Sequence, residues 1–168
     1  MECTKNTSKI ICNPSQKFHE NMTGMNRQAL NLQLSKQKGM DIRPACTFCK
    51  IRRDYPLSQE SQLHFYSECL YTQRFWTEIK DWAQPPLKIN YTIRDRLLGI
   101  PGENAYSMDN TLLREARSTI WGARSAKKLS TIRDLKDRLK RQIPVILMVL
   151  KNQTVQTGLR NLINMANT

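Results

Sequence analysis

The chain lacks the features that would place it in a membrane or outside the cell. Its longest apolar run, VILMVL at residues 145–150, is far shorter than the roughly 20 residues that cross a bilayer. The first residues, MECTKNTSKIIC, are polar and contain no apolar segment of the kind found in signal peptides. Five cysteines is also an odd number for a disulfide framework. We therefore expect an intracellular protein, cytoplasmic or nuclear, with no membrane partner.

Acidic residues are scarce relative to basic ones. The chain has 27 Lys and Arg against 14 Asp and Glu, which gives a formal net charge of +13 at pH 7. The excess is concentrated in the second half: residues 1–84 have 12 basic and 8 acidic residues, whereas residues 85–168 have 15 and 6. An excess of this size favours polyanionic partners, with nucleic acid first among them. The second half is therefore the expected electrostatic surface.

Strand signals are also missing, and the apolar pattern is helical. No pair of strands and no Asn-Gly hairpin signal occurs, while apolar residues recur at three- and four-residue steps. Pro144 is expected either to kink a helix or to begin a new one. Helices are predicted over 26–38 and 60–82, from Thr92 to Gly99, from Asp109 or Asn110, from Ser130 or Thr131, and over 145–165.

These segments predict a mostly α fold with a modest core, because only 39% of the residues are hydrophobic. Residues 1–27 are expected to form an irregular N-terminal extension. Residues 28–84 are expected to form a small, irregular zinc-knuckle-like module with the helix that follows it. Residues 85–168 are expected to form a basic helical region, so that the module leads into a bundle of about four to five helices.

Soft metal ligands are concentrated in one segment, CTFCKIRRDYPLSQESQLHFYSEC, at residues 46–69. Cys46 and Cys49 are separated by two residues, so one tight turn can bring both sulfurs to the same side. His64 and Cys69 follow five residues apart, which is wider than one α-helical turn. Three sulfurs and one imidazole complete a tetrahedral zinc shell, and a closed shell leaves no position for water or substrate. The spacing therefore predicts a structural zinc site.

A simpler interpretation of the same residues stays open. A single Cys-x2-Cys pair can be coincidental, Cys69 can be a core residue on an apolar helix face, and His64 can be an exposed helical residue. Cys3 and Cys12 lie in the irregular start without a His or Cys partner nearby, and we interpret them as free thiols.

The ligand segment resembles the zinc-binding segment downstream of the polymerase in non-LTR (LINE-type) reverse transcriptases. After the Cys-x2-Cys pair, the likeness rests on His64 followed by Phe65, on Cys69, and on the aromatic pair Phe75-Trp76. The zinc ligands alone do not demand this aromatic pair, so it makes the resemblance more specific.

A fainter likeness extends further along the chain, over DRLLGIPG at 95–102 and NTLLREARSTIWGAR at 110–124. The resemblance covers about residues 28–141 in all. A tryptophan-containing stretch that often precedes the first cysteine of the family is missing here.

The resemblance implies that the chain binds RNA or single-stranded DNA, with a reverse transcriptase core as a candidate partner. It does not imply polymerisation, because the sequence has no Tyr-x-Asp-Asp-type pair of aspartates. It also has no Glu/Asp/His set of the kind that a metal-dependent endonuclease needs. We therefore expect a non-enzymatic protein with no small-molecule substrate, either a remnant or a separately encoded tail of a mobile element.

Basic residues gather in the ligand loop and on the predicted helices between residues 114 and 141. A basic helix face can follow a phosphate backbone, although charge runs are also typical of solvated helix faces. Tyr55 or Tyr66 is a candidate for stacking on an unpaired base. The predicted nucleic-acid-binding residues are Lys50, Arg52, Arg53, Arg117, Arg124, Lys127, Lys128, Arg133, Lys136, Lys140 and Arg141.

An alternative function is a protein-interaction adaptor. In that case zinc would fold the central helix, and the apolar stripe of residues 145–163 would dock on a partner such as a polymerase core. The aromatic and apolar residues of the 60–82 helix follow helical spacing and are predicted to be core rather than a stacking platform. They are Phe75, Trp76, Ile79 and Trp82.

Overall fold

The computed structural model describes residues 30–31, 34, 36, 44–51, 58–83, 87 and 90–168. The predicted extension at 1–27 and most of the predicted helix at 26–38 lie outside these residues. The described part is helical and contains no strand; a single antiparallel bridge joins Ala45 to Gln59. Its helical elements are α3 (Thr47–Ile51), the π-helix η1 (His64–Glu68), α4 (Leu70–Ala83), α5 (Ile93–Leu98), α6 (Met108–Ser125), α7 (Ile132–Val149) and α8 (Gln153–Asn167).

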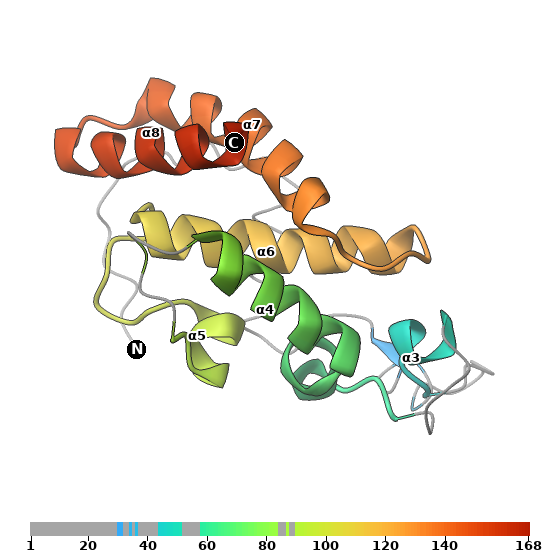
Figure 1. Cartoon of the computed structure of the whole chain (residues 1–168). Coiled ribbons are helices and arrows are strands. Elements are labelled where there is room, and N and C mark those ends of the chain that lie inside the picture. The colour runs from blue at the N-terminus through green and yellow to red at the C-terminus, as the bar shows by residue number, and fades with distance from the viewer. Residues whose placement is uncertain are drawn as a thin grey trace.

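The longest helices form the body of the molecule around α6 (Figure 1). Helices α7 and α8 form an antiparallel hairpin on one side of α6, while α4 and α5 lie on its other side. Helix α3, with the first cysteine pair, lies at one edge of the molecule beside the start of the η1–α4 segment. The predicted order, a small ligand-bearing module followed by a helical bundle, is confirmed.

In the second half of the chain, helices begin at residues whose side chains cap them. Thr92 and Asp95 form a reciprocal capping box at α5, and Thr131 accepts a hydrogen bond from Asp134 N at the start of α7. Both starts agree with the prediction. The predicted cap of α6 was wrong, because Ser107 caps that helix and the Asn110 side chain instead bonds the backbone of the preceding loop.

Two predicted helix boundaries are corrected by the structure. The helix predicted over 60–82 is interrupted at Cys69, where the backbone is extended between η1 and α4. Of the two alternatives given for Pro144, a new helix does not begin there, because α7 runs through this proline and ends at Val149. Ile143 and Ile146 are both buried on either side of it, so packing of the apolar stripe outweighs the hydrogen bond that proline cannot make.

The buried apolar side chains form one contiguous core from the ligand module to α8. Phe65 lies where the elements of the module meet α6. Its ring stacks on Phe48 of α3 at 5.2 Å between centroids and meets the Trp121 ring of α6 edge-on at 6.2 Å. Of the predicted core residues, Phe75, Trp76 and Ile79 are buried and Trp82 is half-buried against the core.

None of the described helices combines the length and the apolar character needed to cross a bilayer.

Candidate metal centre and basic surface

The first cysteine pair is held in place by backbone hydrogen bonds between residues 44–46 and residues 58–60. Cys46 N donates to Ser58 O at 2.8 Å and Glu60 N donates to Pro44 O at 2.6 Å. These bonds flank the bridge between Ala45 and Gln59 and bring the segment after the loop back beside the segment before it. Cys46 immediately precedes α3 and Cys49 lies within it, so one turn presents both sulfurs to the returning chain.

The second ligand pair is aligned by the π-helical turn. Cys69 N donates to His64 O at 2.7 Å, a bond that spans five residues. An α-helical bond spans four, so an α-helix would rotate these two side chains apart. The π-helix η1 accommodates the five-residue separation of His64 and Cys69, because it brings both positions to the same side of the turn.

Side chains of α4 secure this turn at its carbonyl end. Thr72 Oγ1 donates to Phe65 O and Trp76 Nε1 donates to Tyr66 O, each at 2.8 Å. Helix ends leave carbonyls without backbone partners, and these two bonds satisfy carbonyls next to the break at Cys69. Trp76, half of the aromatic pair singled out in the sequence, therefore positions the backbone that carries two metal ligands.

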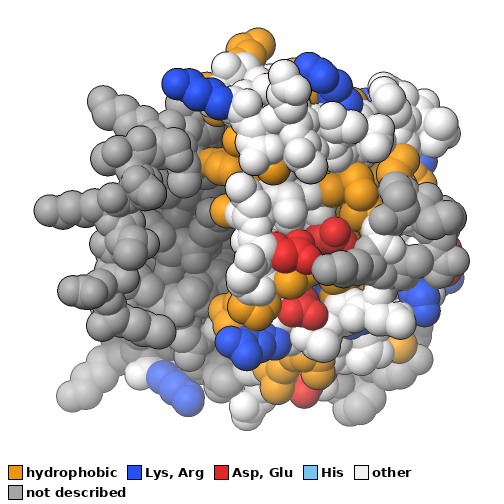
Figure 2. All heavy atoms as spheres, turned by 90° about the vertical axis from the view of Figure 1, so that its left-hand side faces the viewer, with side chains coloured by type: hydrophobic (Ala, Val, Ile, Leu, Met, Phe, Trp, Pro, Cys, Tyr) orange, Lys and Arg blue, Asp and Glu red, His pale blue; other side chains and the backbone are white. Residues whose placement is uncertain are grey.

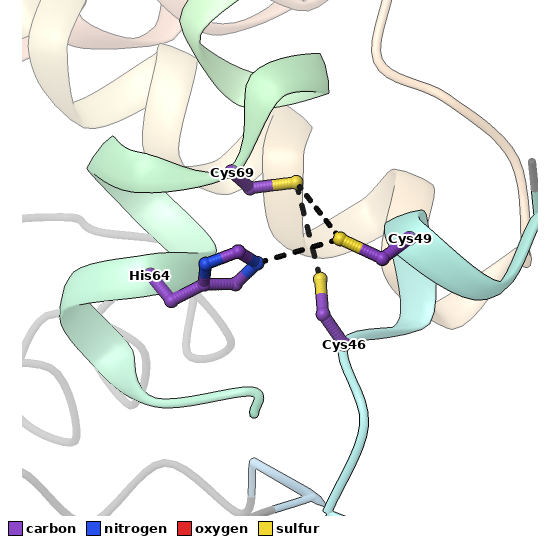
Figure 3. Close-up of side chains that lie close together, drawn as sticks. All are labelled: Cys46, Cys49, His64 and Cys69. Atoms are coloured by element: carbon purple, nitrogen blue, oxygen red, sulfur yellow. Dashed lines mark hydrogen bonds between the residues drawn. The ribbon is translucent and has the colours of Figure 1, made fainter. Parts of the chain in front are cut away.

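The four predicted ligands converge (Figure 3). Their donor atoms all lie within 4.8 Å of one another. Cys69 Sγ is 3.9 Å from both Cys46 Sγ and Cys49 Sγ, and Cys49 Sγ is 3.5 Å from His64 Nε2. All three cysteines are free thiols, since a disulfide would need sulfurs about 2.05 Å apart. The residues can hold one metal ion.

These distances also fit the shape of a zinc shell. Zn–S bonds of about 2.3 Å and Zn–N bonds of about 2.0–2.1 Å in a tetrahedron separate two sulfurs by about 3.8 Å and a sulfur from a nitrogen by about 3.6 Å. The observed separations of 3.9 and 3.5 Å are close to both values. Thiolate and imidazole donors favour zinc and other thiolate-binding ions over magnesium or calcium, which take oxygen ligands.

The three thiols of the cluster titrate together. The pKa of Cys69 is lowered, first because Cys46 donates a hydrogen bond to its sulfur, and also because His64 and backbone N–H groups at the start of α4 point to it. The same hydrogen bond and burial raise the pKa of Cys46, and burial raises the pKa of Cys49. Metal binding must therefore displace protons from Cys46 and Cys49, and the affinity for metal falls as the pH is lowered.

Glu60 connects the metal-binding loop to the rest of the molecule. Its fully buried carboxylate accepts from Asn31 N at 3.0 Å, from Thr47 N at 2.6 Å, and from Arg124 Nε at 2.9 Å and Nη2 at 2.8 Å. Thr47 is the first residue of α3, where a negative group is favourable. Glu60 was not predicted as a functional residue, because no spacing signal distinguishes it from exposed acids such as Glu68.

Some of the predicted phosphate-binding residues have internal partners. The charge of Arg124 is compensated by Glu60, and its guanidinium also lies over the Trp121 ring. Arg117 Nη1 donates to Arg96 O at 3.3 Å. Lys136 Nζ lies 5.3 Å from the centroid of the Trp82 ring. The structure thus gives Arg124 a structural role that its sequence context did not indicate.

The other predicted cations lie nearer the surface. Lys128 Nζ bonds Asp134 at 2.7 Å in an exposed pair. The face shown in Figure 2 has scattered Lys and Arg side chains with acidic ones near its centre, so the positive charge is not concentrated there. Arg52 and Arg53 lie outside the described residues. Within the described part of the chain, the predicted cations whose side chains have no ion pair or hydrogen bond are Lys50, Lys127, Arg133, Lys140 and Arg141.

Two further predictions concern surface contacts. Tyr66 is fully buried, so the prediction that it stacks on a base was wrong for this residue, and Tyr55 lies outside the described residues. In the predicted stripe of residues 145–163, Leu159 and Leu162 are buried inside the chain and Val155 is half-buried, while Val145 and Met148 on α7 are exposed. The part of the stripe on α8 therefore packs within the molecule, and the part on α7 does not.

The chain matches no family model, no curated protein and no solved structure.

Proposed function

We propose that the chain is a non-catalytic, zinc-stabilised module that binds RNA or single-stranded DNA through basic residues of its C-terminal helices. The observation that carries the proposal is the cluster of three sulfurs and one imidazole, whose donor atoms all lie within 4.8 Å of one another. Such a shell is closed, so its ion supports the fold and offers no position to a substrate.

Support for a polyanionic partner comes from charge. The chain has a net charge of +13, and exposed cations such as Lys127, Arg133 and Arg141 have no compensating acid among the described residues. When cations of this kind bind a phosphate backbone, they release its condensed counterions, and this release favours binding. The resemblance to the zinc-binding segment of LINE-type reverse transcriptases is the basis for proposing nucleic acid, and a reverse transcriptase core as a second partner.

The adaptor alternative has less support. Its docking element was the apolar stripe of the last helical segment, and Leu159 and Leu162 of that stripe are fully buried against the chain itself. A helix that already packs its apolar face has little left to offer a partner.

Metal analysis and salt-dependent binding together test the proposal. We expect one zinc per purified chain and binding to a labelled 20-nucleotide uridine oligomer that weakens with salt. For single strands the logarithm of the binding constant falls with that of the salt concentration by about 0.7 per neutralised phosphate. A metal-free folded chain would overturn the zinc part. Binding that ignores salt, or that is absent at low salt, would overturn the nucleic-acid part.

A further inference from the structure

A groove between α6 and α7 has walls of opposite character. Helix α6 contributes only small residues, Ser118, Thr119, Gly122 and Ala123, while α7 contributes Arg138 and Arg141. Lys128, from the turn between the helices, and Asp134 complete the lining, and the volume of the groove is about 170 Å³. Long cations on one wall and a low, uncharged opposite wall leave room for an extended anionic chain.

The cations of this groove differ in how they are held. Arg138 Nε donates to the buried carboxylate of Glu115 at 2.8 Å, which fixes the guanidinium while its terminal nitrogens have no partner among the described residues. Arg141 is exposed and likewise has no partner there. A fixed guanidinium can bind a phosphate through two parallel hydrogen bonds with little loss of side-chain entropy.

Asp134 is the one acid that lines the groove among the described residues. Its carboxylate forms an ion pair with Lys128 Nζ at 2.7 Å and also accepts a hydrogen bond from the Thr131 hydroxyl at 2.8 Å. The three cations of the lining exceed its single acid, and Glu115, which pairs with Arg138 from outside the lining, is shared with Arg114. The groove and its immediate partners therefore keep a net positive charge. Exposed ion pairs contribute little free energy, so Lys128 can exchange Asp134 for a phosphate at small cost.

Gly122 is an independent sign that the groove stays open. It lies exposed in the interior of α6, and a Cβ added to it would meet nothing within 4 Å. Packing inside the chain therefore does not require glycine at a position where it costs the helix roughly 1 kcal/mol relative to alanine. The missing side chain lets a ligand approach the helix backbone closely.

We propose that this groove binds the sugar–phosphate backbone of single-stranded nucleic acid, with Arg138 and Arg141 on successive phosphates and the strand lying over Gly122. This inference rests on the proposed function above and specifies which surface performs it. It adds Arg138 and Gly122 to the residues expected from sequence, and it leaves out Arg124, which does not line the groove and pairs with Glu60 through both Nε and Nη2.

Charge reversal in and outside the groove tests the assignment. Arg141→Glu is compared with Arg94→Glu, since Arg94 is an exposed arginine of α5 with no partner among the described residues. We expect Arg141→Glu to weaken binding of the uridine oligomer about tenfold at low salt and to lower the salt slope by about one contact, whereas Arg94→Glu changes affinity less than about threefold. Far-UV circular dichroism and the thermal midpoint confirm that both variants fold.

A second pair of variants separates charge from bulk at the groove floor. Gly122→Glu and Gly122→Gln add side chains of similar size at a position with open space. Both should weaken binding because they raise the floor, and Gly122→Glu should weaken it about tenfold more because it repels phosphates. Equal affinities of wild type and both Gly122 variants would overturn the groove assignment.

The outcomes distinguish this inference from the proposed function. Salt-dependent wild-type binding with Arg141→Glu no weaker than Arg94→Glu overturns the groove and leaves nucleic-acid binding standing. Absence of salt-dependent wild-type binding overturns both. Inorganic pyrophosphate is titrated in parallel, because a free phosphate could use the same cations. If Arg141→Glu abolishes pyrophosphate binding but leaves oligomer binding unchanged, the groove is a site for free phosphate and the proposal is overturned.

Discussion

The ligand module and the α7–α8 hairpin both have buried interiors, but different kinds of side chain fill them. The module surrounds Cys46, Cys69 and Glu60, all with no exposed surface. The hairpin is closed by leucines and isoleucines, among them Leu139 and Leu159, which are equally buried. Polar groups in an interior are stable only when each is partnered. The comparison therefore indicates that the module depends on a metal ion bound by its ligands, whereas the hairpin depends mainly on apolar packing.

Removal of metal should produce the largest difference between the two regions. Structural zinc sites contribute an apparent binding free energy of about 10–16 kcal/mol, so chelation or Cys49→Ser should abolish zinc binding and unfold η1 and α4. Hydrogen exchange should show protection lost over residues 60–83 and kept in α7 and α8. Cys12→Ser, outside the ligand set, is the matched control. Unchanged zinc content and unchanged exchange in Cys49→Ser would show that the four residues do not hold the ion.

Glu60→Gln should have the next largest effect, because it breaks the polar connection between the module and α6. The substitution removes the charge that compensates Arg124, and loss of one partner of a buried ion pair typically costs about 3–5 kcal/mol. Chemical denaturation followed by circular dichroism measures this cost. Glu78→Gln, at an exposed position of α4, should change the free energy of unfolding little. Equal stability of the two variants would mean that the Glu60 network contributes nothing.

Leu139→Ala tests whether the α7–α8 hairpin can be destabilised without loss of zinc from the ligand module. Removing a fully buried leucine leaves a cavity and should lower the free energy of unfolding by about 2–5 kcal/mol. The zinc content of the folded variant should stay at the wild-type level, because Leu139 lies outside the ligand module. Met148→Ala, on the same helix but 82% exposed, serves as control and should be close to neutral. Loss of zinc from the folded Leu139→Ala chain would contradict the independence of the two regions.

Sequence reasoning succeeded where spacing alone determines the outcome. The four ligands were identified from their separations, and their donor atoms do converge. Capping chemistry placed the starts of α5 and α7, since Thr92 and Thr131 each have an acid three positions on. Hydroxyl caps are local, so no knowledge of the tertiary fold is needed to find them.

The missed features are those that tertiary contacts determine. The break at Cys69 lies inside an uninterrupted apolar period, and its compensation by Thr72 and Trp76 is visible only in three dimensions. The sequence left open whether Pro144 kinks a helix or begins one, and it lies inside α7 because the packed stripe continues past it. Glu60 finds Arg124 across 64 residues of sequence, a pairing that periodicity cannot reveal.

The Glu60–Arg124 pair has one more consequence, for a chain that has lost its ion. Arg124 is held inside the molecule by the Glu60 carboxylate. If the loop around Glu60 opens, the guanidinium loses this internal counter-ion and the chain gains one uncompensated cation. A chain without its ion would then be less ordered, and we expect it to bind polyanions more strongly and with less selectivity.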